Sequence, residues 1–93
     1  MSNDFQFVLS ADEVQTIRIG LNRYIDEAEH GSEDWNDAQD VWEVLDAGSG
    51  KYGFSDLQVD IILGSLDYVG YDRANTLFGR IWDERNAQCY VGA

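Results

Sequence analysis

Cysteine and lysine are nearly missing from this chain. Cys89 is the single cysteine among 93 residues, so no internal disulfide can form, which fits a reducing cytosol. Lys51 is the single lysine, and six bases in all face eighteen acids, for a net charge of −12. A surface with this charge repels nucleic acids and anionic membranes, so we expect the chain to bind neither of them directly.

Long apolar runs are missing as well. No stretch approaches the roughly 20 apolar residues that a membrane-spanning helix requires, and residues 1–9 lack the basic start and apolar segment of a secretory signal. We therefore expect a cytoplasmic protein. Hydrophobic residues still make up 44% of the chain, and three Trp, five Tyr and four Phe supply bulky side chains. This composition predicts a single domain over residues 1–93 with one modest core.

Capping signals and apolar stripes predict a fold that is mainly all-α. Ser10 followed by Glu13 forms a capping box that begins a first helix. The dipeptide His30-Gly31 is expected to end that helix. Ser32 can cap a second helix directly afterwards. Because the break between them is so short, the two helices are predicted to form an antiparallel hairpin.

The second half of the chain predicts one or two further helices. Residues 47–54, AGSGKYGF, read as a loop, after which Ser55 and Gln58 form a second capping box. Gly70 either ends this third helix before a fourth one that Asp72 caps, or marks a kink within a single longer helix. The expectation is therefore three or four helices in all.

Both ends of the chain carry strand-like residues. Phe5–Leu9 alternates large apolar residues with Gln6 and Val8, a pattern typical of a short strand. The tail, Gln88–Val91, could pair with it as a short terminal β-ribbon.

The helical phases also predict a core. Its expected members are Ile17, Leu21, Ile25, Trp42, Leu45, Ile62, Leu66 and Ile81. Ile19 and Val44 fall outside the apolar stripes, so both are expected to be partly exposed. Ile19 is then either an isolated exposed hydrophobic residue or part of a contact with a partner or with a second copy of the chain. The sequence therefore leaves a homo-oligomer as one alternative.

The acids are concentrated in the predicted hairpin. They are Asp26, Glu27, Glu29, Glu33, Asp34, Asp37, Asp40, Glu43 and Asp46. No base lies among these nine acids, so the segment carries −9, while the remaining nine acids and six bases sum to −3. Without an interleaved base, the segment cannot form the i,i+4 ion pairs that usually stabilise charged helices.

A helical row of acids can imitate a nucleic-acid backbone. Carboxylates three or four residues apart are separated by roughly 5–6 Å along a helix axis, and the phosphates of one DNA strand rise about 3.4 Å each. We therefore treat the nine acids as candidate partner-binding residues, directed at a basic protein surface. The alternative is a solvated helix surface that only keeps the protein soluble.

Patterns for catalysis or metal binding are not apparent. Asp34, Asp37 and Asp40 lack the loop spacing of an EF-hand, and His30 is an isolated residue at a helix end. Gly50-Lys51 lacks both the earlier glycine and the following Ser or Thr of a phosphate-binding loop. We expect no catalytic residue, no metal and no cofactor, and hence a binding protein and not an enzyme.

In its size, acidity, scarcity of lysine and lack of catalytic motifs, the chain resembles the small phage and mobile-element inhibitors that mimic nucleic acid, among them anti-restriction and anti-CRISPR proteins. The resemblance is one of composition and assigns no individual residue. It implies an inhibitor in the host cytoplasm that occupies a basic groove of a defence or DNA/RNA-processing protein. Two alternatives remain. One is a small helical adaptor that uses exposed apolar residues such as Ile19 and Val44. The other is adaptation to high salt, which predicts acids over the whole surface.

Overall fold

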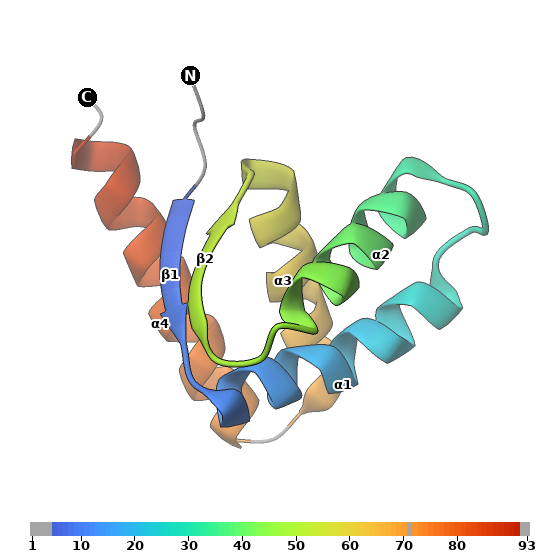
Figure 1. The fold of residues 1–93 in the computed structure, drawn as a ribbon, viewed down its shortest axis with the longest axis horizontal. Coiled ribbons are helices and arrows are strands. Elements are labelled where there is room, and N and C mark those ends of the chain that lie inside the picture. Colours follow the sequence, from blue (N-terminus) through green and yellow to red (C-terminus); the bar gives the residue numbers. More distant parts are fainter. Residues whose placement is uncertain (1–4, 71, 92–93) are drawn as a thin grey trace.

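The computed structural model describes residues 5–70 and 72–91, with side chains described as far as residue 88. In chain order, its elements are β1 (Phe5–Leu9), α1 (Ala11–Glu27), α2 (Glu33–Leu45), β2 (Gly50–Phe54), α3 (Asp56–Val69) and α4 (Asp72–Val91). Figure 1 shows the two strands side by side, α4 and α3 behind them, and α1 along the base of the molecule. The predicted mainly helical class is confirmed, and the described residues form four helices and a two-stranded antiparallel sheet.

The helices begin at the predicted caps. At the start of α1, the Ser10 hydroxyl accepts a hydrogen bond from the Glu13 backbone N–H at 3.2 Å, and the Glu13 carboxylate accepts one from the Ser10 N–H at 2.8 Å. Ser55 and Gln58 repeat this reciprocal pair at the start of α3. Ser32 caps α2 through its hydroxyl. These bonds satisfy donors that the first turn of a helix leaves without partners.

The ends of α1 and α3 test two predictions: where the first helix ends, and whether Gly70 separates the third helix from a fourth. Helix α1 ends at Glu27, earlier than predicted, and Ala28 is already extended. The last turn of α1 contains acids and no base, which opposes the helix dipole and disfavours a longer helix. Gly31 has a φ of +84° within the connecting turn. Gly70 has a φ of +73°, a left-handed conformation that ends α3 and separates it from α4.

Residues 50–54 form a strand, which corrects the prediction of a loop over residues 47–54. Strand β2 pairs antiparallel with β1 and places Phe54 opposite Phe5. Tyr52 and Phe54 are buried and alternate with exposed residues. The segment therefore has the two-residue period of a strand, which its glycines conceal in the sequence.

The strand predicted over Phe5–Leu9 is confirmed as β1, but its predicted pairing with Gln88–Val91 is wrong, because residues 88–91 belong to α4. Once a helix has formed, each added residue contributes one further hydrogen bond, which favours continuation of α4 through these residues. The tail still meets β1 through one side chain. The Gln6 N–H donates to Gln88 Oε1 at 2.7 Å, and Gln88 Nε2 donates to the Gln6 carbonyl at 2.9 Å. The Gln88 amide therefore bonds to β1 as a neighbouring strand would.

The core lies around α3, which contacts the other three helices and β2. Six of the eight predicted core residues are buried. They are Ile17, Leu21, Leu45, Ile62, Leu66 and Ile81. Ile25 and Trp42 are only half-buried, which corrects their assignment. Ile25 packs at the margin of the core. The Arg18 guanidinium lies over the half-buried Trp42 ring, with its Cζ 4.2 Å from the ring centroid.

Candidate functional site

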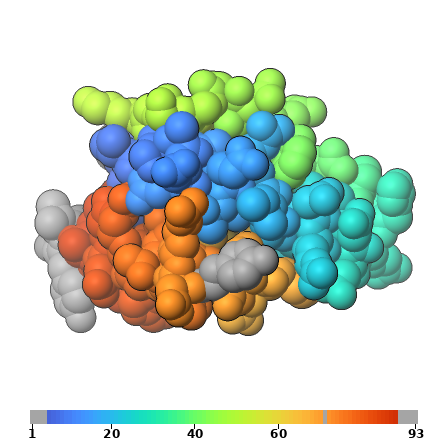
Figure 2. All heavy atoms as spheres, turned by 90° about the horizontal axis from the view of Figure 1, so that it is seen from below, coloured from blue at the N-terminus to red at the C-terminus, as the bar shows by residue number. Residues whose placement is uncertain are grey.

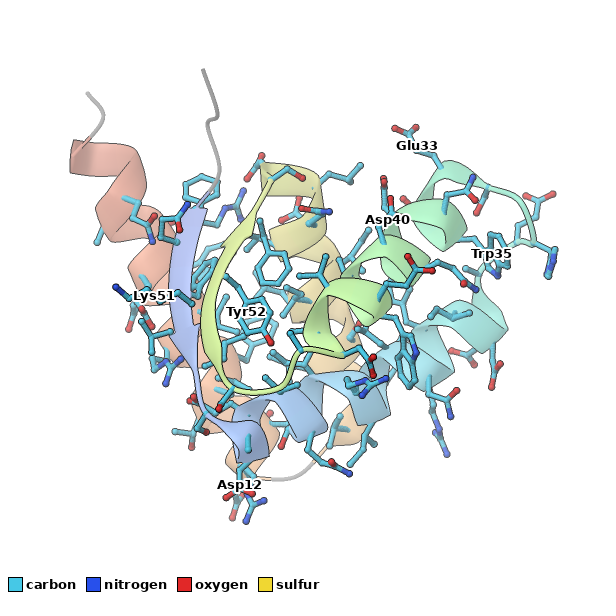
Figure 3. The ribbon with its side chains drawn as sticks, viewed as in Figure 1. Asp12, Glu33, Trp35, Asp40, Lys51 and Tyr52 are labelled. Carbon is cyan, nitrogen blue, oxygen red and sulfur yellow. The ribbon has the colours of Figure 1, made fainter. Side chains whose placement is uncertain are left out.

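The nine predicted binding residues lie on the acidic hairpin, residues 26–46, in which α1 and α2 pack against each other. Three lie at or just after the end of α1, five lie on α2, and Asp46 is the C-cap of α2. All are exposed except Asp37, which is half-buried. In Figure 3, the labelled Glu33 and Asp40 point from α2 away from the body of the molecule.

Four of these acids form what we call the outer row of α2. The row consists of Glu33, Asp37, Asp40 and Glu43. The opposite face of α2 carries the buried residues Ala38, Val41 and Leu45, so the amphipathic spacing of the helix directs the acids toward solvent. By helical phase, Val44 lies among these acids, and it is 44% exposed, which confirms the predicted partial exposure. The row is thus a charged surface with one apolar side chain among its acids.

Within the described residues, nothing neutralises the outer row. None of its four carboxylates forms an ion pair with another described residue, whereas Asp46 lies 3.5 Å from Arg18. The last turn of α2 contains no base. Glu43 therefore lies near the negative end of the helix dipole, where a carboxylate is unfavourable. We therefore expect Glu43 to lower folding stability, and the carboxylates of the row remain available to an external cation.

A second group of acids gathers at the connection between α1 and α2. Glu27, Glu29 and Asp34 line a shallow hollow of about 320 Å³ together with Tyr24 and Tyr68. We call it the hairpin-end hollow. The two tyrosine rings meet edge to face, with centroids 6.3 Å apart. The hollow thus combines three carboxylates with two aromatic rings.

The acids near this hollow contribute to raised pKa values of its two tyrosines. Hydrogen bonding to Glu27, and the negative charge of that carboxylate, raise the pKa of Tyr68 from its ordinary value of 10.0. Burial raises the pKa of Tyr24, and the charges of Asp34 and Asp60 raise it further. Both hydroxyls therefore hold their protons to a higher pH than free tyrosine does, as expected where negative charge is concentrated.

The structure divides the predicted acids and adds residues that the sequence did not reveal. Asp46 forms an ion pair with Arg18 and is not part of the outer row. Tyr68 lies on α3, so only the fold brings it to the hairpin, and no local pattern in the sequence marks it. Trp35 is half-buried, and its ring packs on His30 with centroids 4.3 Å apart.

Among the described residues, no group of three or more His, Cys, Asp or Glu side chains is placed to hold a metal ion. No helix between residues 5 and 91, leaving aside residue 71, is both long and apolar enough to cross a membrane. The side chain of Cys89 lies outside the described residues.

Comparisons with known proteins supply no template for this surface. A scan against protein families and searches of curated proteins and of solved structures each return no match.

Proposed function

We propose that this chain is a non-enzymatic inhibitor whose acidic hairpin occupies a basic surface of another protein. That surface would otherwise hold nucleic acid in a host defence or DNA/RNA-processing protein. The observation that carries the proposal is the outer row, whose four exposed or half-exposed carboxylates form no ion pair with another described residue. Such a face attracts a cationic groove and competes with phosphates for it.

The spacing of the outer row supports mimicry of a phosphate backbone. Its carboxylates recur every three or four residues of α2, which separates them by roughly 5–6 Å along the axis. Phosphates of one DNA strand rise about 3.4 Å each and also wind outward, so the two charge spacings are comparable. A groove whose arginines and lysines match successive phosphates can therefore meet successive carboxylates of α2.

The use of the chain's bases favours binding over general solubility. Arg80 pairs with Glu13 and Glu84, and Arg85 pairs with Asp56 and Asp60. Arg80 and Arg85 are thus paired with acids outside the hairpin. Among the described residues, Asp46 is the only one of the nine hairpin acids that forms an ion pair, and its partner is Arg18. Adaptation to high salt predicts an even spread of acids, and this distribution is uneven.

The hairpin-end hollow can extend the same interface. Tyr68 is exposed beside Glu27, so a partner's guanidinium could contact a carboxylate and an aromatic face together. Arginine commonly binds in both ways, by bidentate pairing with carboxylates and by stacking on aromatic rings. An arginine-rich groove therefore fits this surface better than an isolated lysine does.

Capture from a host lysate tests the proposal. The immobilised chain should recover a basic nucleic-acid-binding protein at low salt and release it as salt rises, because the Debye length falls from about 30 Å at 0.01 M to about 3 Å at 1 M. Recovery of neutral or acidic partners alone, held equally well at both salt concentrations, would contradict it.

A further inference from the structure

Ile19 lies in the middle of α1 with 50% of its surface exposed. Three shallow hollows meet at this side chain, and we call the described residues that line them the Ile19 surface. These residues are Gln15, Thr16, Arg18, Ile19, Asn22, Arg23, Trp42, Tyr68, Val69 and Arg73. All four helices contribute to it. Figure 2 views the molecule from the side of α1, with the start of α4 beside that helix.

The Ile19 surface differs in charge from the rest of the molecule. None of its described residues is acidic, and it contains three arginines, half of the six bases in a chain of net charge −12. Ile19 and Val69 line two neighbouring hollows together. One of these also includes Arg23, and the other, of about 340 Å³, also includes Arg73. The apolar side chains of Ile19 and Val69 are thus flanked by a guanidinium in each direction.

Two of these guanidiniums differ from the other arginines in their pairing. Arg80 and Arg85 each contact two carboxylates. Arg18 lies 3.5 Å from Asp46 and stacks on a tryptophan. Arg23 and Arg73 are exposed, and neither forms an ion pair with another described residue. In a chain with eighteen acids, two exposed arginines without an ion pair to another described residue, both beside Ile19 and Val69, require an explanation.

We infer that the Ile19 surface binds a short acidic segment of a partner protein. One apolar side chain of that segment packs between Ile19 and Val69, and its carboxylates pair with Arg23 and Arg73. This interaction does not depend on the outer row, because its charge is the opposite one and it shares no residue with that row. It gives the chain a second docking surface, able to hold an acidic protein while the outer row holds a basic one.

Charge complementarity selects a short acidic segment over other occupants. A second copy would bring another −12 toward this one, and the two would repel. Duplex DNA carries one charge per about 1.7 Å of its axis, so its repulsion by the whole molecule is greater still. A peptide with few carboxylates meets the two arginines at short range and adds the apolar side chain that Ile19 and Val69 can bury.

Peptide selection on the full chain tests this inference. A displayed library of short random peptides is encoded without lysine and arginine, so that the acidic hairpin cannot recruit basic sequences. We expect the enriched peptides to be net negative with at least one large apolar residue. A fluorescent copy of one such peptide should lose about tenfold or more in affinity on Ile19→Asp and on the double variant Arg23→Gln/Arg73→Gln.

Two control variants define the outcome. Val8→Asp introduces the same charge at a hydrophobic residue that is 63% exposed outside the Ile19 surface, and it should leave peptide affinity unchanged. Neutralising the outer row should also leave it unchanged, which separates this inference from the proposed function. Circular dichroism checks folding, and the arginine variant carries the test if Ile19→Asp unfolds. The inference is overturned if no acidic peptide is enriched or if the arginine variant binds it as the parent does. It is also overturned if Ile19→Asp abolishes dimerisation or oligonucleotide binding instead.

Discussion

Gly20 of α1 lies against the backbone carbonyl of Ser65 in α3. A Cβ built on Gly20 would lie 2.6 Å from the Ser65 carbonyl carbon, closer than real Cβ atoms approach other atoms. Ser65 is fully buried, and its hydroxyl donates to the Ile61 carbonyl at 2.7 Å. The α3 backbone therefore has little room to shift. The missing side chain at Gly20 lets α1 pack closely on α3, which fixes where the hairpin lies on the core.

Gly20→Ala is expected to destabilise the fold despite the higher helix propensity of alanine. Overpacking of this kind costs about 1–3 kcal/mol, and here it is directed at backbone. Gly79→Ala is the matched control, since a Cβ there meets nothing within 4 Å and should stabilise α4 by about 0.5–1 kcal/mol. Urea unfolding measures both. Equal effects of the two substitutions would refute the close contact.

The two ends of the outer row should respond oppositely to loss of charge. Glu43→Gln removes a carboxylate from the end of α2, which has no base in its last turn, and should raise the free energy of unfolding by about 0.3–1 kcal/mol. Glu33→Gln removes a carboxylate from the first turn, where the dipole favours it, and should not stabilise. Thermal unfolding of the two variants at low salt gives the comparison. A gain of the same size from both would point to general repulsion alone.

Gln88→Ala should loosen the edge of β1 with a small effect on global stability. The side chain holds both the N–H and the carbonyl of Gln6, but these groups are exposed, so water replaces much of what is lost. Faster amide hydrogen exchange at Gln6 is the expected readout. Gln88→Glu keeps an acceptor for that N–H and should retain part of the protection. Unchanged exchange in the alanine variant would show that the contact does not order the strand.

The hairpin-end hollow predicts a pH effect in the alkaline range. Because the pKa of Tyr68 is raised in the folded chain from 10.0, the unfolded chain loses this proton first as pH rises. The resulting stability is present below pH 10 and is lost as pH rises through the folded pKa. Glu27→Gln should lower the pKa of Tyr68 toward its ordinary value. The pKa of Tyr24 should stay raised, since burial is its first cause. NMR titration of labelled tyrosines measures both, and an unmoved Tyr68 would contradict the assigned cause.

Local signals in the sequence predicted the helix starts, and non-local contacts explain what it missed. The capping box of Ser10 and Glu13 is formed by residues three apart, so it could be identified without the fold. Strand β2 depends on a partner that begins at Phe5, and its glycines lower the apparent strand propensity of the segment. The exposure of Ile19 followed from helical phase alone.

The candidate site was predictable in composition but not in shape. Four of the five acids of α2 could be placed on one outward face because Val41 and Leu45 define the inward one. Asp46 differs from these acids because it forms an ion pair with Arg18, which lies on another helix, and the sequence alone does not show that pair. The contribution of Tyr68 to the hairpin-end hollow depends on how α3 packs against α1, which no local pattern specifies.

The proposed function requires that the outer row, and not net charge in general, binds the basic partner. The test compares three proteins. The first is the wild type, and the second is the outer-row variant Glu33→Gln, Asp37→Asn, Asp40→Asn and Glu43→Gln. The third is a charge-matched control with Asp12→Asn, Asp67→Asn, Asp72→Asn and Asp83→Asn. These four control acids are exposed, and none forms an ion pair with another described residue.

The most direct measurement is displacement of labelled nucleic acid from the captured partner at physiological salt. We expect the wild type and the charge-matched control to displace it at similar concentrations. The outer-row variant should fail while remaining folded and becoming no less stable, because it loses repulsion together with binding. Displacement by the outer-row variant at the wild-type concentration would contradict the proposed function, as would an equal loss in the control.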